Sequence, residues 1–190
     1  MVSWGKKYLT APSDNNPNNY YRIAKSNPTA NVYVNGVLVP AASFNGGIWY
    51  QFFNNRPNLI ESDLPISVTQ YFTTQGCEQN TGVLYDPDMI VLNPVEQNIN
   101  KVTLVNPPLA NPTPPYEHHL QIVIPNSGTG ISSFRFDGAP VNNAWTVHPS
   151  DPTYSYIYLD VAEGYHTLSS DSGFNALAYG FASAESYGYS

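Results

Sequence analysis

The sequence has little charge and almost no cysteine. Only 11% of the 190 residues are Asp, Glu, Lys or Arg, and 14 acidic residues outnumber seven basic ones. A surface that binds nucleic acid or anionic lipid needs a basic patch, whereas these basic residues are scattered apart from the pair Lys6-Lys7. No apolar run approaches the length of a membrane span, so we expect neither nucleic-acid binding nor membrane insertion.

The single cysteine, Cys77, excludes an intrachain disulfide and a cysteine-based zinc site. One cysteine fits a cytosolic protein and equally a bacterial surface protein that folds without disulfides. The opening residues show no apolar signal-peptide region, and we expect the chain to be a piece excised from a longer protein.

The sequence is rich instead in aromatic and turn-forming residues. It contains 15 Tyr, 17 Pro and 13 Gly, and aromatics make up 14% of the chain. Short apolar and aromatic runs alternate with turn residues at close spacing, which is typical of an all-β sandwich or barrel. The dipeptides Asn35-Gly36 and Asp137-Gly138 each predict a two-residue hairpin, and no segment predicts a convincing helix.

The chain also repeats itself. In both halves a leading strand precedes an Asn/Asp-Gly hairpin, an aromatic strand, a Ser-Asp turn and an apolar strand. The two Ser-Asp pairs are Ser62-Asp63 and Ser170-Asp171. We interpret this order as an internal duplication of a β module, with chance similarity among β-rich segments as the alternative.

The predicted fold is therefore all-β, with two tandem, related β-sandwich-like modules packed together. The alternative is one larger β-sandwich built from both halves. The expected segments are an irregular N-terminal arm at 1–19, a first β module at 20–106 with an extra segment at 76–100, a Pro-rich linker at 107–115 and a second β module at 116–190.

A set of short motifs resembles a known family. The motifs are Ser62-Asp63-Leu64-Pro65 with Gln70-Tyr71, Asp86-Pro87-Asp88-Met89, Pro94-Val95-Glu96-Gln97, Asp137-Gly138, Gly164-Tyr165-His166-Thr167-Leu168 and Ser186-Tyr187-Gly188-Tyr189. From about Tyr20 onward the chain resembles the amino-terminal domain family of IgG Fc-binding protein. Its Asn-rich sequence is similar to that of family members from gliding Bacteroidetes. The resemblance implies an extracellular or cell-surface, non-enzymatic adhesion module of a large multidomain protein. It assigns no ligand-binding residue.

The aromatic residues supply the candidate ligand site. Most of those on strands are expected in the core, namely Trp49, Phe52, Phe134, Phe136, Tyr156 and Tyr158. Trp145, Tyr85 and Tyr116 are expected on loops, where such rings stack on sugars or pack at protein interfaces. They are the candidate ligand-binding residues, for an unidentified protein or glycan.

Two carboxylates, Asp86 and Asp88, are the candidate metal ligands, because Ca²⁺ prefers several oxygen ligands. The favoured alternative is a turn in which Asp86 caps local backbone N–H groups. We therefore expect no cofactor, and a bound Ca²⁺ ion is the alternative. The adjacent His118 and His119 point to opposite faces of a strand and cannot easily share a metal.

These observations favour a non-catalytic binding or adhesion module of a cell-surface or secreted bacterial protein, in contact with the neighbouring domains of its parent. A purely structural spacer is one alternative. A carbohydrate-active hydrolase is the other, since such an enzyme needs only two carboxylates paired by the tertiary structure.

Overall fold

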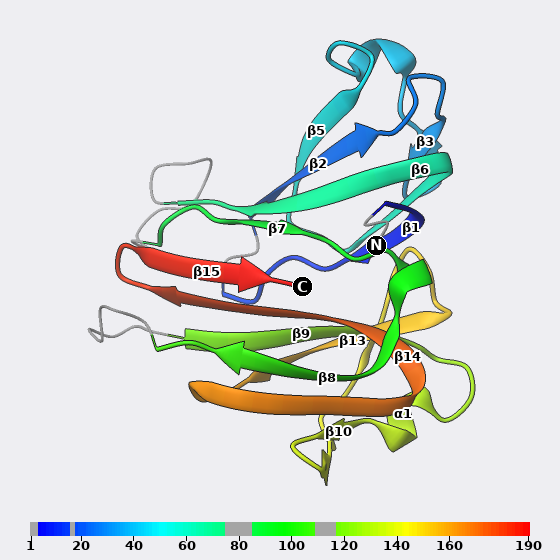
Figure 1. Cartoon of the computed structure of the whole chain (residues 1–190). Coiled ribbons are helices and arrows are strands. Elements are labelled where there is room, and N and C mark those ends of the chain that lie inside the picture. Colours follow the sequence, from blue (N-terminus) through cyan, green and yellow to red (C-terminus); the bar gives the residue numbers. More distant parts are fainter. Residues whose placement is uncertain (1–3, 16–17, 75–84, 109–116) are drawn as a thin grey trace.

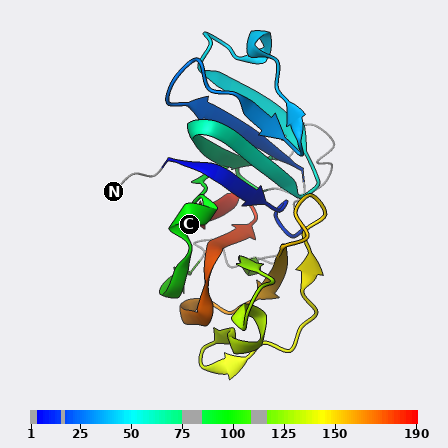
Figure 2. The same ribbon diagram turned by 90° about the vertical axis from the view of Figure 1, so that its right-hand side faces the viewer.

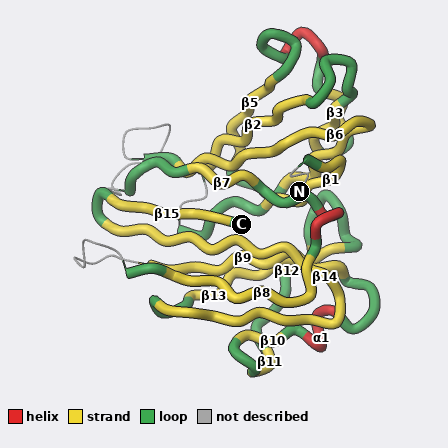
Figure 3. Tube along the Cα trace, viewed as in Figure 1, coloured by secondary structure: helices red, strands yellow, loops and turns green. Residues whose placement is uncertain are grey.

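The chain folds almost entirely into antiparallel β-sheet, as its turn spacing predicts (Figure 1). The structure is a computed structural model, and it describes residues 4–15, 18–74, 85–108 and 117–190. Among these residues the helical pieces are short: α1 (Gly130–Ser133) and the 3-10 turns η1 (Ala41–Ser43) and η2 (Val95–Gln97) (Figure 3). No helix in the described part is long and apolar enough to cross a membrane.

The first module is a seven-stranded sheet. Its strands are β1 (Gly5–Thr10), β2 (Asn19–Lys25), β3 (Val32–Val34), β4 (Val37–Leu38), β5 (Trp49–Asn54), β6 (Asn58–Phe72) and β7 (Met89–Val91). Five of them follow the order β4-β3-β6-β2-β5, and β1 and β7 also pair with the long central strand β6.

The second module is an eight-stranded sheet. Its strands are β8 (Ile99–Asn106), β9 (Glu117–Pro125), β10 (Arg135–Phe136), β11 (Ala139–Pro140), β12 (Thr146–Val147), β13 (Tyr154–Asp160), β14 (Gly164–Ala182) and β15 (Glu185–Tyr189). The order is β11-β10-β14-β9-β13-β12, and β8 and β15 also pair with the long strand β14.

Seven strands of the second sheet follow the topology of the first, and β12 is an additional edge strand. The strands β1 to β4 correspond to β8 to β11, and β5, β6 and β7 correspond to β13, β14 and β15. The registers agree as well: Lys7 lies opposite Glu61 in the first sheet, and Lys101 lies opposite Ser169 in the second. Even the break in pairing recurs, just before Lys7 in β1 and just before Lys101 in β8. This agreement confirms two related β modules.

Both predicted hairpins are present and use the same local chemistry. Asn35 and Asp137 have φ of 52° and 50°, and the glycine after each is also in the left-handed region. This geometry is that of a type I′ turn, which suits the twist of the flanking strands. The side-chain oxygen of Asn35 accepts the N–H of Leu59, and that of Asp137 accepts the N–H of Thr167.

The Ser-Asp pairs do not end a strand, which corrects the predicted turns there. β6 and β14 continue through Ser62-Asp63 and Ser170-Asp171 and change pairing partners at those points. At the first pair, the carboxylate of Asp63 accepts the backbone N–H and the side-chain amide of Asn31. Because these bonds satisfy polar groups where the ladder is irregular, the strand can bend without stopping.

The predicted segment boundaries also need correction at both ends of the first module. The expected irregular arm at 1–19 contains β1, whose Tyr8 and Thr10 are buried against β6. β8 lies within the predicted first module but pairs with β14 of the second. β7, in the expected extra segment at 76–100, is an integral edge strand and the counterpart of β15. Most of the Pro-rich linker lies outside the described residues, as does Cys77.

The modules stack one above the other and share apolar packing (Figure 2). One hydrophobic cluster fills the second module around Ile122, Phe134 and Phe174. The cluster of the first module includes Tyr179 and Phe181 on β14, so its core continues onto the sheet of the second module. The shared cluster fixes how the two sheets present their outer faces.

Candidate binding surface

Two of the three candidate ligand-binding aromatics, Tyr85 and Trp145, lie among the described residues. Tyr85 is buried and stacks on Phe181 with ring centroids 4.6 Å apart, so it contributes to the contact between the modules. Trp145 is partly buried and packs edge-on against Phe134 at 5.3 Å. Tyr116 lies outside the described residues. The burial of Tyr85 does not fit the loop platform expected there.

Asp86 and Asp88 make local contacts. The backbone carbonyl of Asp86 accepts the hydroxyl of Ser186, and Asp88 Oδ1 accepts the N–H of Met89 at 2.7 Å. Partial burial raises the pKa of Asp88, although the hydrogen bonds from Met89 and Gly188 oppose this shift. This arrangement ties the segment before β7 to β15.

A different set of potential metal ligands meets at the contact between the modules. In the described ranges, one group of three has all its ligand atoms within 4.8 Å of one another: Asp14, His119 and Asp160. His119 is buried, and its two ring nitrogens lie 2.9 Å from Asp160 Oδ1 and 3.2 Å from Glu117 Oε2. His118 instead contacts the hydroxyl of Tyr187, so the adjacent imidazoles have separate partners, as the alternation along a strand predicts.

The outer surface of the first sheet carries an unexpected band of aromatic and apolar side chains. We call it the β2 face, and it consists of outward residues from β5, β2, β6 and β7. They are Trp49, Gln51, Phe53, Tyr20, Arg22, Ala24, Ser67, Thr69, Tyr71, Met89 and Val91. Paired residues share a face, so Phe53, Tyr20, Tyr71 and Met89 form one row across four strands.

Arg22 is the one charged residue of the β2 face, and aromatic rings flank it. Its guanidinium carbon lies 4.9 Å from the ring centroid of Trp49 and 5.1 Å from that of Tyr71. Two of its nitrogens also donate to Gln51 Oε1, at 2.8 and 3.2 Å. These contacts hold the two rings and the cation in fixed positions on the surface, each cation–π contact contributing about 0.5–1 kcal/mol at such sites.

Several apolar side chains of this face are open to solvent. Met89 is 56% exposed, Val91 45% and Trp49 37%, although the sequence analysis expected Trp49 in the core. The error has a simple cause: β5 carries aromatic residues at both odd and even positions, so alternation cannot show which set points inward. Exposed apolar groups gathered on one sheet face, rather than scattered singly, mark an interaction surface.

The counterpart of this face on the second module is covered by the first module. We call it the β9 face; by register it contains Tyr156, Tyr158, His119, Gln121, Val123, Asn175, Leu177 and Tyr179. Tyr158 donates its hydroxyl hydrogen to the carbonyl of Pro12 at 2.5 Å, and the hydroxyl of Tyr179 accepts the N–H of Asp14 at 2.8 Å. Burial raises the pKa of both hydroxyl groups well above the usual pKa of tyrosine.

The outward side of β1 completes this cover. Lys7 Nζ lies 2.7 Å from Asp151 Oδ2 and also sits over the ring of Tyr154. Burial would raise the pKa of Asp151, but hydrogen bonds from Lys7 and Thr153 outweigh it and hold that pKa below its usual value. These contacts, with those of Tyr158 and Tyr179, form what we call the junction.

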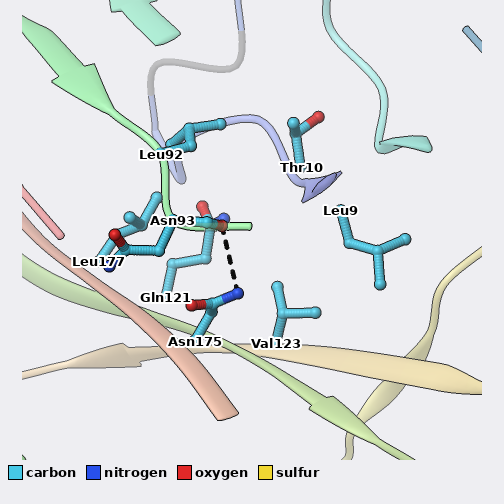
Figure 4. A pocket seen from close by; sticks show the side chains of 8 residues that line it. All are labelled: Leu9, Thr10, Leu92, Asn93, Gln121, Val123, Asn175 and Leu177. Atoms are coloured by element: carbon cyan, nitrogen blue, oxygen red, sulfur yellow. Dashed lines mark hydrogen bonds between the residues drawn. The ribbon is translucent and has the colours of Figure 1, made fainter. Parts of the chain in front are cut away.

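A small cavity of about 20 Å³ lies inside the junction (Figure 4). Leu9 and Thr10 of β1 line it from one module, and Gln121, Asn175 and Leu177 line it from the other. Gln121 is buried, and its Oε1 has no hydrogen-bond partner among the described groups. The volume suits one water molecule, which would satisfy this oxygen without opening the junction to a larger ligand.

A wider groove of about 340 Å³ runs between the β10–β11 hairpin and β13. Its described lining residues include Phe136 and Tyr158, and Asp160 is the one among them with a carboxylate. A glycoside hydrolase needs two carboxyl groups flanking the bond that it cleaves. The groove as described therefore does not supply the pair that the hydrolase hypothesis requires.

Comparison with known protein families gives a match to this chain. The family model described as IgGFc binding protein matches residues 1–180, which is nearly the whole chain and covers both modules. No curated protein and no solved structure matches the sequence. Because the matched region spans well over half of the chain, the chain belongs to the IgGFc-binding protein family.

Proposed function

We propose that this chain is a non-catalytic, extracellular adhesion module of a larger bacterial surface or secreted protein, and that it binds a protein ligand through the β2 face. The observation that carries the proposal is the difference between the two counterpart faces. The β9 face is covered by polypeptide, whereas the β2 face leaves Met89, Val91 and Trp49 open to solvent.

The chemistry of the β2 face favours a protein ligand over a glycan. Aromatic residues, Met and Arg are enriched in protein interfaces, and Trp, Tyr and Arg dominate their binding energy. The β2 face combines Trp49, Tyr71, Met89 and a pre-positioned Arg22. Its counterpart also shows that a face with this backbone geometry accepts polypeptide, since Tyr158 and Tyr179 bond backbone groups of the segment after β1.

Binding arrays on the purified chain test this function. The protein array includes the IgG Fc fragment, because the family description names it, and a glycan array is run in parallel. Trp49→Ala and Met89→Lys are expected to weaken binding of the ligand found by about tenfold or more each, as interface anchors do. The matched control is Val37→Lys, which alters an exposed apolar residue on the β3–β4 hairpin.

Each outcome of the arrays decides between the hypotheses. Protein binding that is sensitive to both β2-face variants and insensitive to Val37→Lys supports the proposal. Binding of glycans alone contradicts the protein ligand. An absence of binding on both the protein array and the glycan array favours the structural spacer.

A further inference from the structure

We propose that one occupant of the β2 face is a second copy of this chain, which docks the β8 side of its second module there. The β8 side is defined as the outward residues of β8 and of the adjacent part of β14, namely Ile99, Lys101, Thr103, Val105 and Tyr165. This inference rests on the proposed use of the β2 face for binding protein and names a partner for it.

The junction inside the chain shows how one module docks on the next. The second module presents its β9 face, and the first module meets it with the outward side of β1 and with its core cluster, in which Phe72 packs on Tyr179. Lys7 and Leu9 are the outward residues of β1 that contact the second module, through Asp151 and the small cavity. One part of this contact therefore places the outer face of one module against the first-strand side of the module before it.

Both of these surfaces recur, uncovered, elsewhere in the same chain. The β2 face is the first module's version of the β9 face, and β8 is the second module's version of β1. The register makes Lys101 the counterpart of Lys7 and Thr103 the counterpart of Leu9. One chain thus carries an open outer face in one module and an open first-strand side in the other.

The exposure of the β8 side matches that of the β2 face. Ile99 is 41% exposed, Val105 39% and Tyr165 81%, and the last two lie directly opposite each other across β8 and β14. The β2 face and the β8 side are the counterparts of two surfaces that already meet inside the chain, the β9 face and the outward side of β1. Contact between two copies can therefore bury their exposed apolar groups against each other. The contact joins different patches on the two copies, so it is heterologous and can extend head to tail.

Sedimentation velocity on the intact chain is the first test. We expect the weight-average mass to rise at least about twofold between about 1 µM and about 500 µM, the range in which weak protein contacts form. A mass that stays at the monomer value throughout this range overturns the inference.

A mixing experiment tests the geometry of the contact. One variant carries Met89→Lys with Val91→Lys on the β2 face, and the other carries Val105→Lys with Tyr165→Lys on the β8 side. Each variant loses one of the two surfaces, so each alone is expected to stay monomeric. Together they retain one intact surface each and are expected to form a capped dimer and nothing larger.

The control variant carries Val37→Lys with Leu38→Lys on the β3–β4 hairpin, which belongs to neither surface, and it is expected to associate like the wild type. Far-ultraviolet circular dichroism and melting temperature confirm that every variant is folded. A mixture that stays monomeric, or a dimer formed by either variant alone, overturns the heterologous contact. The array experiment is read separately, so binding of a foreign protein by a monomeric chain supports the proposed function while rejecting this partner.

Discussion

The counterpart strands β2 and β9 have equivalent neighbouring strands and the same register, but they differ in the exposure of their outer faces. Along β2 the side chains alternate between buried and partly exposed, as in a sheet with one face in solvent. From His118 to Ile124 every side chain of β9 is buried, because the first module covers its outer face. The duplicated fold therefore fixes which face of the sheet a side chain points to. The stacking of the two modules decides whether that face is exposed to solvent.

The side chains at matched positions reflect this difference. Arg22 on β2 corresponds to Gln121 on β9, and Tyr20 corresponds to His119. A guanidinium buried at the position of Gln121 would lose its hydration, which costs several kcal/mol unless a carboxylate compensates. On the open face the same charge keeps contact with water and rests between two rings. The covered face accordingly uses neutral or hydrogen-bonded groups.

The largest expected effect comes from truncating matched tyrosines. Tyr179 is buried against Phe72 and Phe181 and bonds Asp14, so Tyr179→Ala is expected to cost about 3–5 kcal/mol of unfolding free energy. Tyr71 is its counterpart on the open face. Tyr71→Ala is expected to lower the free energy of unfolding by about 1 kcal/mol, chiefly because the contact with Arg22 is lost. Urea unfolding of both variants measures the difference. Equal costs would show that the two faces are equally covered.

A smaller effect is expected from the matched lysines Lys7 and Lys101. Lys7→Met removes the partner of Asp151 at the junction and is expected to cost about 1–2 kcal/mol, whereas Lys101→Met on the exposed β8 side is expected to be close to neutral. The control for packing is that both variants keep an aliphatic chain of similar length. A loss in Lys101→Met as large as that in Lys7→Met would contradict the difference in cover.

The Lys7 contact also has a pH dependence. Because the pKa of Asp151 in the fold lies below its usual value of about 4, the stabilisation is fully present above that pH and is lost as pH falls through the folded pKa. The wild type and Lys7→Met are therefore expected to converge in stability as the pH is lowered below about 4. Urea midpoints at a series of pH values measure this.

The smallest expected effect lies at the matched hairpins. Asp137 pairs with His166 in the second module, where Asn35 pairs with Asn58 in the first. Burial alone would lower the pKa of His166, but hydrogen bonds to Asp137 and to the carbonyl of Ala162 raise it. The stabilisation is therefore present below the usual histidine pKa of about 6.5 and is lost as pH rises through the folded value.

Asp137→Asn converts the charged pair into an amide pair like that of the first module. The expected loss is about 0.5 kcal/mol between about pH 4 and pH 6.5, because the pair is partly screened by solvent, and it is smaller at higher pH. Melting temperature against pH measures it. A loss that does not change with pH would mean that the ion pair contributes nothing beyond the turn bond to Thr167.

Much of the fold follows from local sequence, and the composition of the β2 face does not. Asn35-Gly36 and Asp137-Gly138 define hairpins through backbone conformations that few residues adopt, so sequence alone located both. The strand β1 was missed because the Asn-rich end of the segment 1–19 indicated an irregular arm, although Tyr8 and Thr10 alternate inward. Trp49 was expected inside because β5 carries aromatic residues at both odd and even positions. Tyr85 was expected on the surface because its burial depends on the stacking of the modules, which no local pattern shows.

Hydroxyl-radical footprinting of the monomeric chain tests the central claim most directly. The account holds that the two modules are alike in fold and that the outer face is open in the first and covered in the second. Met89 and Tyr71 are therefore expected to be oxidised rapidly, while Tyr158 and Tyr179 are expected to be protected until the chain unfolds. Oxidation of Tyr179 as fast as that of Tyr71 in the folded chain would contradict the account.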